Sequence, residues 1–331
     1  MDTTTERILR RRMHGLYLTR PCGDITELSR ELLGLHSWFH RNVAFSALIR
    51  GADLTGWQHA LTKTWIHHAL HGVAFDDLPA LLAVNSGPWR WGEPYQEIAE
   101  EVLRLMQDGI TSRAEMRPLF ADRYDPDILE SAFSPWGGVF CELARLGKVA
   151  FRSMTSRDFD LIDAEPTQTY DEVLPELFRR FIAAYGPATI KDAVWFFGLK
   201  VVMPGDRKNA LSALNLDAYG RFVHDKKTYY YIDEPTDMGD IPEYTLLSGF
   251  DPLIASYVDR GMVLPPEYKK AVITRAGICM PSIAINGQVA GLWNIKNDKT
   301  EVEFFAEQPK RIKDAVCDWV EMIRWGTAGR L

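Results

Sequence analysis

Residues 181–199 read FIAAYGPATIKDAVWFFGL and place two helical patterns end to end, the first ending at Gly186. An amphipathic helix is predicted over 171–186, and a second helix over 187–199. A third helix is expected over 206–216, and short runs at 221–225 and 226–233 predict a hairpin. Three helices followed by a two-stranded hairpin are typical of a winged helix-turn-helix.

The same order of elements precedes this unit. Helices are predicted over 93–107, 111–125 and 125–147, and alternating runs at 148–154 and 159–165 suit a hairpin. Ser112 and Glu115 stand at capping-box distance, as expected where the second of these helices begins. Residues 1–92 fit a more divergent copy, with helices over 3–14, 25–34 and 42–51 and strands near 64–71 and 72–77.

The sequence changes in character after residue 245. Residues 271–306 hold β-branched runs on either side of Asn286-Gly287, a strong signal for a two-residue hairpin turn, and a final helix is predicted over 307–326. We therefore predict an α+β fold, predominantly helical. Three tandem winged helix-turn-helix lobes would cover 1–92, 93–168 and 169–245, and a small β-rich lobe with the C-terminal helix would cover 246–331. The alternative is a mixed α/β enzyme with helix-rich lobes.

Composition and motifs exclude several classes of protein. The 331 residues are 46% hydrophobic and 25% charged, which is ordinary for a globular protein. No signal peptide and no long uncharged apolar run is apparent, so we expect a cytoplasmic protein that does not enter a membrane. Four scattered cysteines without a CxxC pair suggest neither disulfides nor a thiolate zinc site. The lack of Walker, GxGxxG, GxSxG and kinase motifs excludes nucleotide-dependent and serine-hydrolase chemistry.

Charge is unevenly distributed along the chain. The formal net charge is −7, yet the first 50 residues contain eight arginines, no lysine and five acidic residues. A local basic face can bind phosphates on an acidic protein, because the relevant field extends over roughly 8 to 10 Å. Arg11 and Arg12, in the run Arg10–Arg12, are therefore candidates for DNA binding. The competing interpretation is a solvated helix face.

Four runs occur in one order along the chain: LTKTWIHHALHGVAFDDLPALLA at 61–83, FIAAYGPATIKDAVWFFGL at 181–199, LLSGFDPLIASYVDRGMVLPPEY at 246–268 and INGQVAGLW at 285–293. Together they resemble the tandem winged-helix DNA glycosylases typified by AlkZ and YcaQ. The resemblance implies a C-shaped assembly of three winged helices and a β-lobe that cradles duplex DNA. It also implies excision of alkylated bases, including the unhooking of interstrand crosslinks.

In this family, activity depends on a polar-x-polar motif directly after the sequence leucine, glycine, leucine. The motif is usually Gln-x-Gln or Gln-x-Asp, and His-x-Gln in some branches. Here Leu33-Gly34-Leu35 is followed by His36 at the first polar position and Trp38 at the second. Trp38 is a departure, because an indole has one N–H donor and no acceptor.

Excision of a base passes through a cation-like sugar and needs an acceptor that holds or deprotonates water. We predict His36 as the catalytic residue, since a neutral imidazole can orient water. Trp38 could stack on a base or fill an abasic gap. An extended chain, which the resemblance favours, would point His36, Trp38 and His40 one way, whereas a helix would bring only His36 and His40 to one face. The competing interpretation is ordinary core.

Further candidates for substrate or DNA binding are Arg41, His71, Asp251 and Arg260. The family usually has the sequence Arg-Gly-Thr-Leu-His here, and His71 matches its last residue. In this chain His67 and His68 stand in place of the arginine and the glycine. Asp251 could stabilise a sugar cation if the β-rich lobe reaches the cleft, and Arg260 could bind a phosphate or pair with an aspartate. His67 and His71 could share a helical face and hold a metal, but a third ligand is missing, so we expect neither metal nor cofactor.

Three functional hypotheses fit these patterns. The first is a monomeric, monofunctional DNA glycosylase that removes bulky or cationic alkylpurines from double-stranded DNA. The second is a noncatalytic DNA binder, a lesion sensor or regulator, in which Trp38 has replaced a polar catalyst. The third, suggested by ten tryptophans and the acidic bulk of the chain, is a protein that sequesters a genotoxic small molecule in an aromatic cleft.

Overall fold

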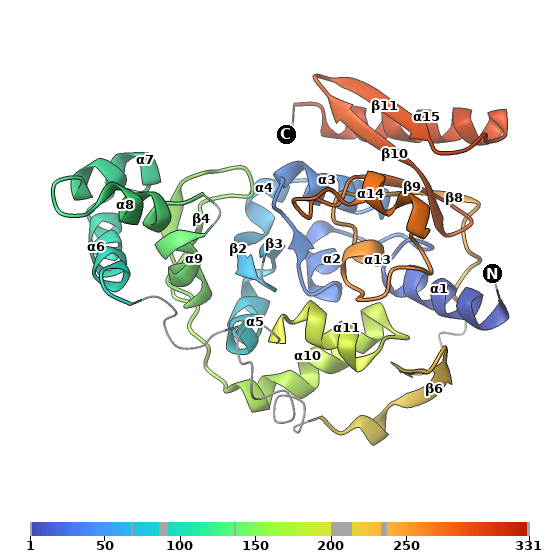
Figure 1. The fold of residues 1–331 in the computed structure, drawn as a ribbon, viewed down its shortest axis with the longest axis horizontal. Helices are drawn as coiled ribbons and strands as arrows, with labels where there is room; N and C mark the ends of the chain where they lie inside the picture. The colour runs from blue at the N-terminus through green and yellow to red at the C-terminus, as the bar shows by residue number, and fades with distance from the viewer. Residues whose placement is uncertain are drawn as a thin grey trace.

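The computed structural model describes residues 2–67, 69–85, 92–135, 137–199, 214–232 and 237–329. The fold is α+β, as predicted, with helices around three antiparallel sheets (Figure 1). Helices α6 to α9 form a lobe at one end of the molecule. The C-terminal helix and its sheet lie across the top of the view, opposite α10 and the hairpin strand β6.

The N-terminal unit contains α1 (Thr3–Gly15), α2 (Ile25–Glu31), α3 (His40–Ile49) and α4 (Trp57–Ala60), which confirms the three long helices predicted there. Its strands are β1 (Leu35–His36), β2 (Thr62–Ile66) and β3 (Ala69–Val73). The predicted strand limits of 64–71 and 72–77 are wrong, because the turn falls at His67, whose φ is 48°. The segment Phe75–Asp77 is instead a 3-10 helix, η1, which leads into α5 (Leu78–Asn85).

The second unit contains α6 (Tyr95–Gln107), α7 (Arg113–Met116), η2 (Arg117–Phe120), α8 (Pro126–Ala132) and α9 (Gly138–Arg145). The single helix predicted over 125–147 is broken into α8 and α9. The chain turns sharply at Gly138, where φ is 69° and a Cβ would lie 2.1 Å from the Ala132 carbonyl oxygen. Only glycine fits such a turn, so the helix cannot run through it.

Two short strands, β4 (Val149–Phe151) and β5 (Phe159–Leu161), close this unit. β4 pairs with β2 of the N-terminal unit at Lys63 and Phe151. The result is one five-stranded sheet of order β1-β3-β2-β4-β5 that joins the two units. The second unit has a separate hydrophobic core around Phe120, Phe140 and Phe159, whereas the N-terminal unit shares one core with the third unit and the C-terminal part.

The third unit contains α10 (Tyr170–Tyr185) and α11 (Ile190–Phe196), as the opening run predicts. Thr189 and Asp192 form a capping box that fixes the start of α11. Residues 206–213 of the predicted third helix lie outside the described residues, and a short 3-10 helix, η3 (Leu216–Ala218), begins at the end of the predicted range. The hairpin of β6 (Gly220–His224) and β7 (Lys227–Tyr231) is confirmed, and its strands pair from Gly220 with Tyr231 to His224 with Lys227.

The C-terminal part holds a four-stranded sheet of order β11-β10-β9-β8. Its strands are β8 (Tyr244–Leu247), β9 (Ser282–Ile285), β10 (Gln288–Lys296) and β11 (Lys299–Phe304). The Asn286-Gly287 turn is confirmed, with φ values of 46° and 78° as its type requires. Short helices α13 (Pro252–Ala255), η4 (Pro266–Tyr268) and α14 (Lys269–Val272) lie between β8 and β9, and α15 (Lys310–Thr327) ends the chain. Among the described residues, no helix could span a membrane.

The arginine run of α1 is not a solvated helix face. Arg11 is 8% exposed and Arg12 only 3% exposed. Arg11 donates to the Ile232 carbonyl and its guanidinium lies over the Tyr231 ring, so its predicted contact with DNA is wrong. Arg12 Nε donates to the Pro187 carbonyl at 3.0 Å, and its guanidinium lies 3.8 Å from the Tyr257 ring centre. α1 thus uses both arginines to join the third unit to the rest of the fold.

Candidate functional site

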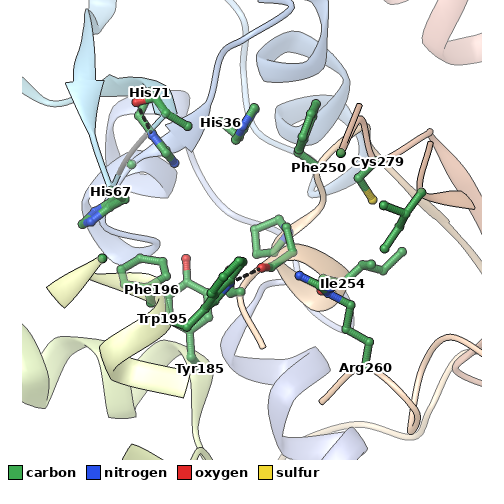
Figure 2. Close-up of a pocket in the computed structure, with 18 of the residues that line it drawn as sticks. His36, His67, His71, Tyr185, Trp195, Phe196, Phe250, Ile254, Arg260 and Cys279 are labelled. Carbon is green, nitrogen blue, oxygen red and sulfur yellow. Dashed lines mark hydrogen bonds between the residues drawn. The ribbon is translucent and has the colours of Figure 1, made fainter. Parts of the chain in front are cut away.

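A cavity of about 510 Å³ lies between three histidines of the N-terminal unit, helix α11 and the segment around α13. We call it the histidine pocket (Figure 2). His36, His67 and His71 lie along one side, Trp195 and Phe196 lie on another, and Phe250, Ile254, Arg260 and Cys279 close it. The volume is within the range of small-molecule and cofactor sites.

The Leu33-Gly34-Leu35 sequence brings His36 to this pocket. Helix α2 ends at Glu31, and the chain reverses through Leu33 and Gly34, whose φ values are 55° and 110°. A Cβ at Gly34 would lie 3.0 Å from Val73 Cγ1 and 3.3 Å from Ile66 Cδ1, so the site requires glycine for both conformation and space. β1 then pairs with β3 so that His36 stands directly opposite His71.

His36 is held by ring contacts. Its ring stacks on Phe250 with centres 3.9 Å apart and meets His71 edge-on at 5.2 Å. Within the described part of the chain, His36 Nδ1 is buried and has no hydrogen-bond partner. Burial and the neighbouring His71 hold the pKa of His36 well below its ordinary value. The ring is therefore neutral at pH 7 and can accept a hydrogen bond from water or substrate through a nitrogen lone pair.

His71 and His67 continue this side of the pocket. His71 Nδ1 donates to the Ala69 carbonyl at 3.2 Å, and burial lowers its pKa to about 4, so this ring is also neutral. The His67 ring lies edge-on to His71 with centres 5.3 Å apart, and its Nε2 donates to the Leu33 carbonyl at 3.1 Å. The helical arrangement considered for His67 and His71 is wrong, because His67 occupies the turn and His71 a strand. No group of three metal-ligating side chains occurs among the described residues.

Phe250 is fixed by the turn that ends at Asp251. Phe250 has a φ of 56°, a left-handed conformation that costs a non-glycine residue roughly 1 to 2 kcal/mol. Its N–H donates to the Cys279 carbonyl at 3.1 Å. Asp251 accepts from the Ser248 and Leu253 N–H groups, which closes the turn on both sides of Phe250. A strained aromatic residue held against His36 is typical of a functional site.

Asp251 itself does not reach the pocket. It is 0% exposed and forms a bidentate ion pair with Arg50 at 3.1 Å. Arg50 also donates to the Leu16 and Ser46 carbonyls, so both charges are fully engaged inside the protein. The predicted role of Asp251 in stabilising a sugar cation is therefore wrong, and its role is to hold the turn of Phe250.

The opposite side of the pocket comes from α11. Trp195 is 47% exposed, and its indole Nε1 donates to the Ala255 carbonyl at 3.0 Å. Arg260, which was predicted as a site residue, lines the pocket beside it. Arg260 Nε donates to the Ile254 carbonyl, and its guanidinium lies 5.7 Å from the Trp195 ring centre. The aspartate partner considered for Arg260 is not found among the described residues.

The predicted residues Trp38, His40 and Arg41 lie outside the histidine pocket. Trp38 is half-buried and packs against the second hydrophobic core. His40 begins α3, where burial and the nearby Lys63 and Arg41 charges lower its pKa. Arg41 donates to the Ile295 carbonyl at 3.1 Å. The expectation that His36, Trp38 and His40 face one way is wrong, because the extended segment ends at His36 and a helix starts at His40.

Three residues of the histidine pocket, Trp195, Phe196 and Phe250, were not predicted from the sequence. Trp195 could have been found from its helical position, because it lies four residues after Lys191 and so shares the polar face of α11. In the structure both residues point outward, whereas Asp192, Ala193 and Phe196 are buried. An exposed tryptophan on the polar face of an amphipathic helix indicates a binding role. Phe250 carries no comparable signal, because its turn is defined only by contacts with distant residues.

The buried histidines predict acid sensitivity. His71 has a pKa of about 4 in the folded protein against an ordinary 6.5, so the unfolded chain takes up the proton first as the pH falls. Stability is expected to be constant above pH 6.5 and to fall between pH 6.5 and about 4, with a loss of about 2 kcal/mol at pH 5 from this group. Urea unfolding at pH 7.5 and pH 5 measures it. His71→Gln should show a smaller loss over this range, and an unchanged loss would contradict the assignment.

The model of a known family matches most of the chain. The description "DNA glycosylase AlkZ-like" applies to the match, which covers residues 53–321. The chain belongs to the AlkZ-like family of DNA glycosylases, a family of DNA-repair proteins. The match begins after the stretch that contains His36, so it assigns the family and not the role of that residue.

Individual relatives agree with this assignment. The chain is 25% identical over 280 residues to an interstrand DNA cross-link repair glycosylase of Streptomyces sahachiroi, across 75% of this chain and 74% of the relative. The solved structure of the Streptomyces sahachiroi DNA glycosylase AlkZ superposes with a TM-score of 0.74 and 21% identity, over 98% of this chain and 97% of that one. The two proteins share one fold over nearly their whole length.

Proposed function

We propose that this protein hydrolyses the N-glycosidic bond of bulky or cationic alkylated purines in duplex DNA. Family membership supports a DNA glycosylase, and the name of the Streptomyces relative supports interstrand crosslinks as further substrates. The observation that carries the proposal is the position of His36, a neutral imidazole at the side of an aromatic pocket large enough for a base.

His36 acts on water rather than on the leaving group. Its low pKa makes it a weak base, so it orients the attacking water and accepts its proton only as the bond to the sugar forms. A purine alkylated at a ring nitrogen already carries a positive charge and leaves as a neutral base. Such a substrate therefore needs no general acid, which removes the need for the second polar residue that Trp38 replaces.

The enzyme is proposed to be monofunctional. No lysine is among the residues that line the described histidine pocket, so no amine is available there to attack the sugar. The protein is also proposed to act as a monomer. The three units of helices and hairpins are proposed to act as winged helices on the duplex.

Trp195 is proposed to stack on the extruded base. Enzymes that act on a base in DNA hold it between aromatic and apolar side chains, and Trp195 offers an exposed ring that Ala255 and Arg260 hold in place. Trp195→Ala is expected to lower single-turnover excision of N7-methylguanine by roughly tenfold to a hundredfold, because base–aromatic stacking contributes about 1 to 3 kcal/mol. Trp325→Ala removes a more exposed tryptophan, 68% against 47%, from α15 and should leave the excision rate unchanged. Equal rates for the two variants would contradict the stacking role.

Incubation of excess protein with a duplex that carries one N7-methylguanine tests the function itself. Heat- or alkali-labile abasic sites should form and should be absent from undamaged duplex.

The second hypothesis, a noncatalytic lesion sensor, is favoured by one observation: Trp38 packs against the second hydrophobic core. Tight, salt-dependent binding without base release at any pH would select the sensor and reject the glycosylase.

A further inference from the structure

A second cavity, of about 520 Å³, lies between the β6–β7 hairpin, the first turn of α11 and residues 258–259. We call it the wing cavity. It shares no lining residue with the histidine pocket. Its lining residues are Arg12, Thr189, Ile190, Lys191, Asp192, Lys226, Lys227, Thr228, Tyr229, Tyr230, Val258 and Asp259.

The two carboxylates of the wing cavity are already engaged. Asp192 accepts from the Thr189 N–H at 2.9 Å through one oxygen and from the Val258 N–H at 2.9 Å through the other. Asp259 accepts from the Gly261 N–H and forms an ion pair with Lys227. The neighbouring acid at the hairpin turn, Asp225, lines a different cavity. These carboxylates are therefore committed to capping helices, closing turns and neutralising Lys227.

Three cationic side chains of the wing cavity have no such partner. Arg12 is buried on the Tyr257 ring and forms no ion pair with any described carboxylate. Lys191 and Lys226 are exposed at the cavity, and neither has an ion pair within the described part of the chain. The Arg12 charge contributes to the lowered pKa of Asp259, but Asp259 forms its direct ion pair with Lys227. A buried guanidinium without a directly paired anion is costly unless an anion completes the site. The chemistry of the wing cavity therefore fits a phosphate, which arginine and lysine bind through charge-assisted hydrogen bonds.

The wing cavity lies beside the histidine pocket along α11. Lys191 lines the wing cavity and Trp195 lines the histidine pocket, and residues four apart on a helix share a face about 6 Å apart along its axis. The segment 256–260 also runs between them, since Ser256 and Arg260 line the histidine pocket whereas Val258 and Asp259 line the wing cavity. Successive phosphates of one DNA strand advance by about 3.4 Å along the duplex axis. A strand that places a base against Trp195 therefore has backbone phosphates within reach of Lys191.

We propose that the wing cavity binds a backbone phosphate of the strand that carries the damaged base, about one or two nucleotides from that base. The inference rests on the proposed function, because it uses the base position in the histidine pocket. Lys191 and Lys226 meet the phosphate from α11 and from the hairpin turn, and Arg12 supplies the buried positive charge beneath it.

Undamaged duplex tests the site without requiring excision. Fluorescence anisotropy at several salt concentrations compares the full-length protein with Lys191→Gln, Lys226→Gln and the double variant. Arg12 is left intact because its removal could unfold the protein. Lys310→Gln, on α15 at the opposite side of the molecule (Figure 1), removes an equal charge as a matched control. Each single variant is expected to weaken binding about threefold to tenfold, and the double variant to reduce the salt slope by about two.

Two results would overturn the phosphate site. One is a double variant with the affinity and salt slope of the unaltered protein. The other is stabilisation by inorganic phosphate that the double variant loses while duplex affinity stays unchanged, which would assign the cavity to a free phosphate compound. Because the duplex carries no lesion, a protein that fails to excise bases can still pass this test, and an active glycosylase can fail it.

Discussion

Replacement of His36 by alanine is expected to lower single-turnover excision of N7-methylguanine by about a hundredfold to a thousandfold. Removing a group that orients water or stabilises charge in the transition state costs roughly 2.7 to 4 kcal/mol in other enzymes. Affinity for undamaged duplex should stay within about twofold, because His36 lies inside the pocket and not on a basic surface. Rapid-quench assays with protein in excess measure the chemical step directly.

Two further variants separate chemistry from packing. His36→Phe keeps a ring to stack on Phe250 but loses the nitrogen lone pair, so it should be as inactive as His36→Ala. His36→Gln restores an acceptor at the position where the family most often has glutamine, and it should retain more activity than either. An active His36→Phe variant with an unchanged melting temperature would reject His36 as the catalytic residue.

Loss of the Asp251 carboxylate is expected to have the largest effect on stability. Asp251→Ala leaves the Arg50 charge buried without a partner, and both side chains of the pair are 0% exposed. Breaking a buried ion pair by removing one partner costs about 3 to 5 kcal/mol. We expect the melting temperature to fall by roughly 10 °C, as measured by differential scanning calorimetry.

Matched variants test why Asp251 matters. Asp240→Ala breaks the ion pair of Arg10 at the surface, where Asp240 is 91% exposed, and should cost no more than about 0.5 kcal/mol. The double variant Arg50→Met, Asp251→Leu removes both charges and should be more stable than Asp251→Ala. If Asp251→Ala were as stable as Asp240→Ala, the buried pair would not hold the Phe250 turn.

The turn of Phe250 links the stability of the protein to its proposed activity. Asp251 fixes Phe250, and Phe250 stacks on His36, so Asp251→Ala should also lower excision at temperatures where the protein remains folded. Asp251 was a candidate for direct contact with the sugar. Its effect instead passes through the position of an aromatic ring, which sequence position could not reveal.

Sequence by itself determined the local structure and the family. Helical periodicity, the Gly186 helix end and the Asn286-Gly287 turn depend on residues close together in the chain, so α10, α11 and the hairpins could be predicted. The Leu33-Gly34-Leu35 sequence located His36 only through its resemblance to the family motif, and the structure then shows that the turn formed there requires glycine. The burial of individual side chains was harder to predict. The single helix expected over 125–147 is wrong, because the chain turns at Gly138.

Tertiary structure alone decided which residues form the site. Phe250 reaches His36 and Asp251 reaches Arg50 across more than 200 positions of the chain, so no local pattern contains these contacts. Arg11 and Asp251 were predicted to contact DNA or substrate and are internal, whereas Trp195 was not predicted as a site residue and is exposed. The sequence next to a charged or aromatic residue can be the same whether that residue is buried or exposed. Only the packing of the distant elements fixes whether water, substrate or another side chain meets it.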